Sequence, residues 1–126
     1  MKQEEKDLLL KDLCARLPYS VSVNYKGDIY DVLGVSHGRL IFCKPFMSHT
    51  LEYCPLVEEV KPHLFPLSSM TEEQKKEYKQ FLVNIDGYAY SIDCVPQIDW
   101  LNKNHFDYRG LIPMGLAIDC TNLNIY

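Results

Sequence analysis

The sequence lacks the features that mark several large classes of protein. No stretch approaches the roughly eighteen apolar residues of a membrane-spanning helix, and the first residues lack the apolar run of a signal peptide. Basic residues are outnumbered, with 13 Lys and Arg against 17 Asp and Glu and a net charge of −4. Duplex DNA and RNA binders draw most of their affinity from neutralised phosphates. We therefore expect a cytoplasmic protein without membrane contact, and we do not expect nucleic acid as a partner.

The sequence also lacks the short signatures of common reaction types. It contains neither a Gly-x-Ser-x-Gly elbow nor a glycine-rich phosphate loop. Its five cysteines stand singly, without a Cys-x-x-Cys pair, and are expected to be reduced thiols filling small spaces. Cys43, His49 and Cys54 are near neighbours in sequence, but a closed zinc site commonly takes four ligands in close pairs. The sequence thus predicts no catalytic residue, metal or cofactor, and it favours a protein that is not an enzyme.

What the sequence does contain is the composition of a folded domain. Hydrophobic residues make up 47% of the chain, including nine tyrosines and five phenylalanines, which indicates a substantial core. A length of 126 residues is that of one domain, and we expect residues 1–126 to form a single domain. A chain of this size folds without disulfides or metals because it buries about two-thirds of its unfolded surface.

Hydrophobic periodicity predicts an α+β fold. Leu9, Leu13 and Leu17 recur every four residues and predict a helix over 3–17. Apolar and polar residues then alternate, with tight turns between the runs, which predicts an antiparallel meander of strands over 20–25, 29–35 and 39–44. Two shorter strands are expected over 50–54 and 57–61. The sheet is accordingly predicted to be a small meander or an SH3-like partial barrel.

The second half of the chain is predicted to be mostly helical. Pro62 and Pro66 indicate a rigid segment that crosses the core over 62–67. A capping box, either Ser69 with Glu72 or Thr71 with Gln74, precedes a helix expected over about 70–85. The face of that helix expected to be buried consists of Tyr78, Phe81, Leu82 and Ile85. A strand or link over 88–93, a helix opened by Pro96 and a terminal strand or tail are expected to follow.

One segment, Asp99–Ile112, concentrates the chemically versatile side chains. It contains the only tryptophan, and its candidate ligand-binding residues, here called the C-terminal cluster, are Trp100, His105, Asp107, Tyr108 and Arg109. In one interpretation they line a pocket, where His105 takes a proton, Asp107 orients it and Arg109 grips a carboxylate or phosphate. In the other interpretation these residues form a structural corner, a turn between two helices that is held by contacts within the protein. Asp107 then caps the next turn, Arg109 pairs with a nearby carboxylate and the Tyr108 ring packs in the core.

Apolar neighbours of the C-terminal cluster bear on this choice. Phe106 and Leu111 are large apolar residues within the same segment. They indicate that the chain turns back into the core there, so the sequence favours the structural corner over the ligand site.

Tyrosine is more abundant than a small core requires. The residues in question are Tyr19, Tyr25, Tyr30, Tyr53, Tyr88, Tyr90 and Tyr126. Tyrosine is favoured at recognition surfaces, where it supplies a large contact area and one hydrogen bond. It also fits the half-buried faces of ordinary strands. The sequence leaves both interpretations open, and the first supports a binding role.

Two segments carry a resemblance to other proteins. They are Asp99–Ile112, extended to Gly115-Leu116-Ala117, and Val60–Glu73. Over residues 57–118 the chain resembles short uncharacterised proteins encoded by gut-anaerobe genomes, prophages and mobile elements. That family carries no assigned activity, so the resemblance transfers no catalytic or ligand role. It implies an accessory protein of a bacterium or its phage.

Three functions from different classes follow as hypotheses. The leading one is a non-catalytic binding or interaction protein that has a protein partner or associates with itself. The second is a binder of a small ligand, such as a nucleotide-like signal, held by His105, Tyr108 and Arg109. The third, less favoured, is a small hydrolase that uses His105 and Asp107.

Overall fold

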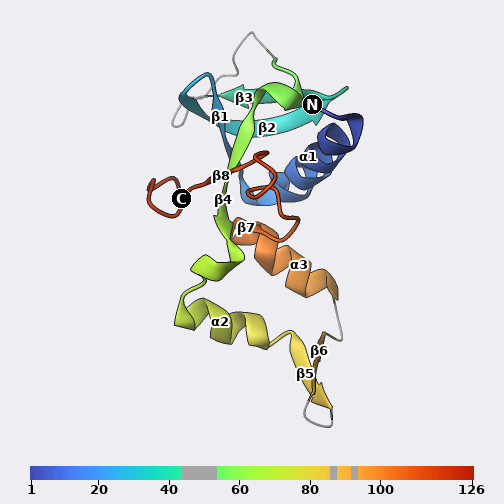
Figure 1. Cartoon of the computed structure of the whole chain (residues 1–126), viewed down its shortest axis with the longest axis vertical. Coiled ribbons are helices and arrows are strands. Elements are labelled where there is room, and N and C mark those ends of the chain that lie inside the picture. Colours follow the sequence, from blue (N-terminus) through green and yellow to red (C-terminus); the bar gives the residue numbers. More distant parts are fainter. Residues whose placement is uncertain (44–53, 86–87, 92–93) are drawn as a thin grey trace.

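A long N-terminal helix, a mostly antiparallel sheet and two further helices make up the α+β fold (Figure 1). The structure is a computed structural model that describes residues 1–43, 54–85, 88–91 and 94–126, with the side chains of 42–43, 82–85, 88–91 and 94 left out of the description. The sheet and the first helix form a body at one end. The second helix and a hairpin extend from it at the other end.

Helix α1 (Gln3–Arg16) covers the sheet and confirms the predicted N-terminal helix. Leu9 and Leu13 are fully buried, as the four-residue spacing indicated. Asp12 and Arg16 are equally buried and lie on the same side of the helix. The buried face of α1 therefore carries one ion pair among its leucines. A 3-10 turn, η1 (Leu17–Tyr19), follows at Pro18.

The predicted meander is confirmed as β1 (Ser22–Tyr25), β2 (Asp28–Ser36) and β3 (Arg39–Cys43). β2 pairs with both neighbours in antiparallel fashion, and a bulge falls between Val32 and Gly34. The complete order is β3-β2-β1-β4-β7, with β8 also paired to β4. Among the described strands no pairing joins β3 to β7, so the sheet is an open meander and not a closed barrel.

The next part of the sheet differs from the prediction. The strand expected over 57–61 is a 3-10 turn, η2 (Val57–Glu59), and the crossing segment is the strand β4 (Lys61–Pro66). β4 pairs with β1 at Lys61 and Pro62, with β8 (Ile118–Asp119) at the next two residues and with β7 (Phe106–Asp107) at the last two. Each of these pairings covers only two residues of β4. The N–H groups that Pro62 and Pro66 lack therefore interrupt no long run of strand hydrogen bonds. The strand expected over 50–54 lies largely outside the described residues.

The helix predicted over about 70–85 is shorter than expected. After a 3-10 turn, η3 (Leu67–Ser69), helix α2 (Glu72–Lys79) ends well before 85. The following residues form β5 (Leu82–Ile85), paired with β6 (Tyr88–Ser91) in an antiparallel hairpin. Apolar residues at positions 82, 83 and 85 are compatible with a strand as well as with a helix. For this reason the hydrophobic pattern predicted a helix that is too long. Of the two capping boxes, the structure uses Thr71 with Gln74.

The hydrophobic core lies entirely in the body. Its buried members come from residues 9–64 and 111–117, and no described residue of α2 is buried. Tyr25 and Tyr30 belong to this core, with their rings edge to face, so these two tyrosines serve packing. The side chains of Tyr53, Tyr88 and Tyr90 lie outside the description, and a recognition role for the other tyrosines stays a prediction. Helix α3 (Cys94–Lys103) buries Leu101 and Asn102 beside the body. Within the described part of the chain, no helix is both long and apolar enough to cross a bilayer.

Candidate functional site

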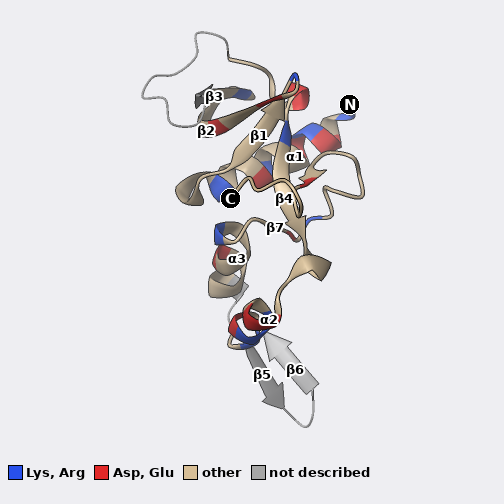
Figure 2. Cartoon of the chain, turned by 90° about the vertical axis from the view of Figure 1, so that its left-hand side faces the viewer, with Lys and Arg blue, Asp and Glu red and all other residues tan. Residues whose placement is uncertain are grey.

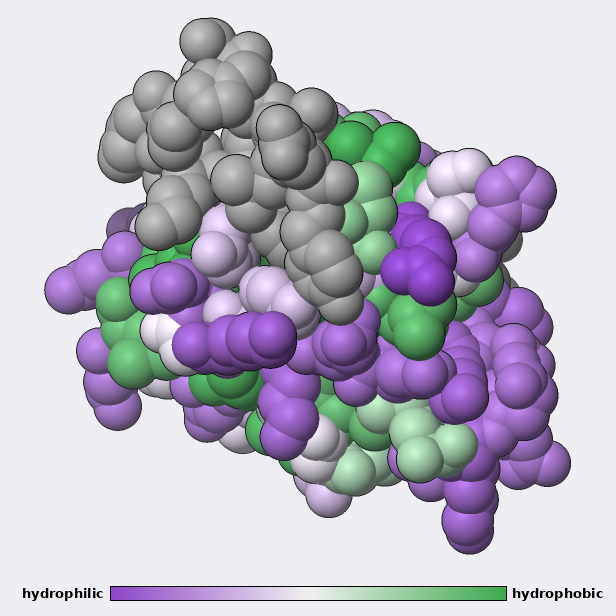
Figure 3. Space-filling view, turned by 90° about the horizontal axis from the view of Figure 1, so that it is seen from above, coloured by the Kyte–Doolittle hydropathy of each residue, from purple (hydrophilic) through white to green (hydrophobic). Residues whose placement is uncertain are grey.

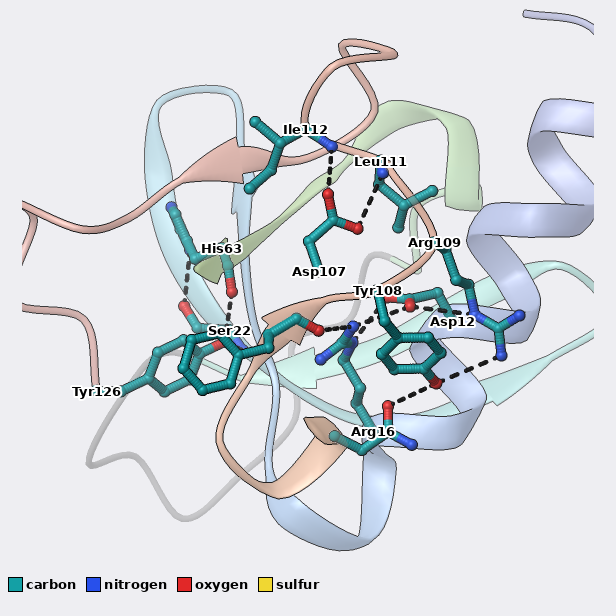
Figure 4. A network of polar contacts seen from close by, with 12 residues as sticks. Asp12, Arg16, Ser22, His63, Asp107, Tyr108, Arg109, Leu111, Ile112 and Tyr126 are labelled. Carbon is teal, nitrogen blue, oxygen red and sulfur yellow. Dashed lines mark hydrogen bonds and ion pairs between the residues drawn. The ribbon is translucent and has the colours of Figure 1, made fainter. Parts of the chain in front are cut away.

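A fully buried carboxylate lies beneath the C-terminal cluster. Asp12 of α1 accepts hydrogen bonds from Arg16 Nε at 2.8 Å and Arg16 Nη2 at 3.0 Å. The Nε of Arg109 approaches the same carboxylate at 3.4 Å. Figure 4 shows the two guanidinium groups meeting at Asp12. Arg109 therefore pairs with a carboxylate of the protein itself, as the structural-corner interpretation expected.

Tyr108 lies between the two arginines. Its ring centroid is 5.3 Å from Arg16 Cζ and 5.1 Å from Arg109 Cζ, within the range of cation–π contacts. Its hydroxyl donates to Asn102 Oδ1 at 2.9 Å. The ring and the hydroxyl of Tyr108 are thus both engaged by the protein, and the side chain links α1, α3 and the segment after β7.

Asp107 caps the turn that follows it. Its two carboxylate oxygens each accept a backbone N–H at 2.9 Å, one from Leu111 and one from Ile112. The side chain is buried, so both of its acceptors are committed to the turn. Asp107 shares no hydrogen bond with His105, and the pair that a hydrolase would need is not formed.

His105 stacks on the ring of Tyr126, with centroids 3.5 Å apart and planes 6° apart. Its backbone has a left-handed φ of 62°, and its buried Nδ1 has no hydrogen-bond partner. Burial, and secondarily the charge of Arg16, lowers the pKa of His105 to about 4. The imidazole is therefore neutral near pH 7 and engaged in packing.

Trp100 lies in a different set of contacts. Its Nε1 donates to Glu77 Oε2 at 3.0 Å, and its ring stacks on Phe106 with centroids 5.6 Å apart. The structure therefore unites only Tyr108 and Arg109 around Asp12, and it places Trp100, His105 and Asp107 in separate contacts. The Asp107 cap and the Arg109–Asp12 pair are contacts that the structural-corner interpretation expected. Ligand binding by the side chains of the C-terminal cluster stays a prediction.

A second buried polar group has no signal in the sequence. Ser22 Oγ and His63 Nδ1 are 3.0 Å apart and share a hydrogen bond between β1 and β4. The hydroxyl of Tyr126 accepts from Ser22 N and donates to His63 O, both at 2.9 Å (Figure 4). Burial lowers the pKa of His63 and raises that of Tyr126. Ser22 and His63 are only 3% and 2% exposed, so this pair stabilises the sheet and offers a substrate no access.

The described cysteines differ in their exposure. Cys120 is buried, and burial raises the pKa of its thiol to about 11. Cys14 is exposed and Cys54 is half-buried. The side chains of Cys43, His49 and Cys94 lie outside the described part of the chain. Among the residues that are described, no group of three or more His, Cys, Asp or Glu side chains is placed to hold a metal ion.

A pocket of about 280 Å³ opens beside the C-terminal cluster. Its lining residues come from β4, η3, α2, β7 and the segment after β8, and they are Phe65, Ser69, Thr71, Gln74, Phe106 and Thr121. None of the five residues of the C-terminal cluster lines it. Sequence reasoning missed this site because its residues are scattered and carry no charge.

The low pKa of His105 predicts a loss of stability in mild acid. Its folded-state pKa of about 4 lies below the ordinary value of 6.5, so protonation favours the unfolded chain. Stability is complete above the unfolded pKa, falls as pH decreases through this window and levels off below the folded pKa. Between about pH 7.5 and about pH 5 the expected loss is about 2 kcal/mol in urea denaturation.

The variant His105→Asn provides the control for this titration. Asparagine tolerates the left-handed backbone and does not titrate in this window. The variant should lose most of the pH dependence. An equal decline in wild type and variant would assign the effect to other groups, such as His63.

Taken together, the described side chains offer no assembled catalytic pair. Asp107 is committed to the turn that follows it and Arg109 pairs with Asp12, while the buried Nδ1 of His105 has no hydrogen-bond partner. The Ser22–His63 pair is closed to solvent, and the described residues that line the pocket are neutral. Comparison of the chain with family models, with curated proteins and with solved structures finds no match in any of the three.

Proposed function

We propose that this chain is a non-catalytic interaction protein that associates with a second copy of itself. The contact surface is the arm, defined as α2 together with the β5–β6 hairpin. The observation that carries the proposal is that this hairpin joins no third strand among the described residues. A two-stranded hairpin is marginally stable in water unless a further layer covers it.

The strands of the hairpin have the composition of a covered sheet. Neither Leu82–Ile85 nor Tyr88–Ser91 contains a charged residue. In the observed register, Val83 is opposite Tyr90 and Ile85 is opposite Tyr88. Alternation along the strands places these residues on one face, with Leu82, Asn84, Ala89 and Ser91 on the other. The first face is the more apolar and is the proposed contact.

Helix α2 has a charge pattern suited to a symmetric partner. Its first turn carries Glu72 and Glu73, and its last turn carries Lys76 and Lys79. Figure 2 shows both signs of charge on this short helix, next to the hairpin. Two copies related by a two-fold axis, with their α2 helices antiparallel, place acidic ends beside basic ends. This complementarity favours a second copy as the partner.

The surface of the body supports the choice of the arm. Seen from above, the described part of the body shows hydrophilic side chains over most of its surface and apolar side chains in separate patches (Figure 3). Dispersed apolar residues are normal on a monomer surface. We also propose an accessory role in a bacterium or its phage as the setting for such a dimer.

The test is the state of association of paired hairpin variants. V83E/Y90K places opposite charges on the apolar face while keeping a favourable pair across the strands. The wild type should sediment as a dimer at about 100 μM, where a micromolar dimer is mostly formed. The variant should sediment as a monomer with an unchanged circular dichroism spectrum, because charges at this face would lose their hydration in the dimer.

The matched control puts the same charges on the opposite face. Asn84 and Ala89 are also cross-strand partners, so N84E/A89K preserves the pairing and should remain a dimer. A monomeric wild type at this concentration would refute the proposal, as would a dimer that survives V83E/Y90K.

A further inference from the structure

The pocket beside the C-terminal cluster has a rigid apolar wall. Phe65 and Phe106 are among the residues that line it, and their ring centroids are 6.1 Å apart. Phe106 is 1% exposed and is backed by the stacked ring of Trp100. Phe65 contacts the ring of Tyr126. Because both rings are held by other aromatic side chains, the wall is already formed in the free protein.

The rest of the lining is polar and uncharged, and its internal hydrogen bonds define what remains for a ligand. Thr71 Oγ1 accepts from Gln74 N, so its own proton is available to donate. Gln74 Oε1 accepts from Thr71 N, which leaves Nε2 as a donor. Ser69 Oγ donates to Pro66 O, and Thr121 Oγ1 donates to Asp119 Oδ1. The lone pairs of these two hydroxyl oxygens remain available as acceptors. The lining therefore retains hydrogen-bond donors at the start of α2, on Thr71 and Gln74. It retains acceptors on Ser69 and Thr121.

We infer that this pocket is a binding site for a small uncharged planar ring that bears an amide edge. The ring packs on Phe65 and Phe106, the amide carbonyl accepts from Thr71 or Gln74, and the amide N–H donates to Ser69 or Thr121. A volume of about 280 Å³ lies at the lower limit of ordinary ligand pockets, so it admits one ring and not an extended molecule. The pocket shares Gln74 of α2 with the arm, but its ligand is proposed on separate observations and is tested by titration and not by the state of association.

The lining also selects against anions. None of the described residues that line the pocket is Lys or Arg, and the carboxylate of Asp119 lies next to it through its hydrogen bond to Thr121. A carboxylate or phosphate placed there would lose hydration without gaining a cationic partner. The proposed ligand class is therefore neutral, in contrast to the anion expected for an Arg109 site.

Two probes of nearly equal shape test this selectivity. Benzamide carries the neutral amide, and benzoate carries a charged carboxylate in its place. In ¹H–¹⁵N NMR titrations, benzamide should give saturable shifts at the backbone amides of Thr71, Gln74 and Thr121, with a dissociation constant on the order of 1 mM, as for a single-ring fragment. Benzoate should bind at least about tenfold more weakly, because its charge is not compensated.

The variant Gln74→Glu removes the proposed donor without removing the cap, since glutamate serves equally well at this position of a capping box. It should weaken benzamide binding about tenfold, as expected for a lost hydrogen bond beside a new negative charge, at unchanged thermal stability. Gln80→Glu, outside the pocket, adds the same charge and should bind as the wild type does. The absence of localised shifts with benzamide, equal binding of benzoate, or full binding by Gln74→Glu would each overturn the inference.

Discussion

Replacing Asp12 with alanine is expected to destabilise the protein by about 3–5 kcal/mol, the usual cost of leaving a buried charge without its partner. Asp12 and Arg16 are completely buried, and the guanidinium donates twice to this carboxylate. Arg109 loses the carboxylate that lies 3.4 Å from its Nε in the same change. Because Arg16 also donates to Phe106 O at 2.7 Å, the charge cannot turn towards solvent without releasing β7.

The measurement is the free energy of unfolding from urea titration, with Asp12→Leu/Arg16→Met as the comparison. Removing both charges and keeping the volume should recover about half of the loss. The groups left without their partners are then the carbonyl of Phe106 and the partly exposed guanidinium of Arg109. Lys75→Gln breaks the exposed Lys75–Glu72 pair and should change stability by less than about 0.5 kcal/mol. An Asp12→Ala protein within about 1 kcal/mol of wild type would contradict the buried network.

Replacing Phe106 with alanine should cost a similar amount, about 3–5 kcal/mol, through the cavity that it leaves. Phe106 is almost fully buried and contacts the rings of both Trp100 and Phe65. It therefore joins α3 to β4, at the point where the body meets the arm. Phe106→Leu fills most of the space and should cost about 1–2 kcal/mol.

The single tryptophan provides a local measurement for the same variants. Trp100 stacks on Phe106, so its fluorescence in the folded Phe106→Ala protein should shift to longer wavelength as water gains access to the indole. Leu123→Ala, at an exposed side chain, should change neither the emission nor the stability. Unchanged emission together with a loss below about 1 kcal/mol would show that Phe106 does not join these elements.

Local signals in the sequence predicted part of the candidate site correctly. Asp107 was expected to cap the next turn and does so with both oxygens. Arg109 was expected to pair with a carboxylate, but nothing local identified Asp12, which lies near the other end of the chain. The resemblance to phage and mobile-element proteins, the choice between binding protein and enzyme, and the ligand role of the C-terminal cluster stay predictions.

The sequence by itself determined the elements whose reason is local. The four-residue spacing of Leu9 and Leu13 specifies α1, alternation and tight turns specify the meander, and Thr71 with Gln74 specifies the start of α2. Each of these rests on residues within a few positions of one another.

Only the tertiary structure decided where distant residues meet. It placed the proline-containing segment 61–66 inside the sheet, buried Arg16 against Phe106, inserted the Tyr126 hydroxyl between β1 and β4, and assembled the pocket from scattered residues. These contacts depend on burial and on strand pairing across the whole chain, which no local pattern of side chains encodes.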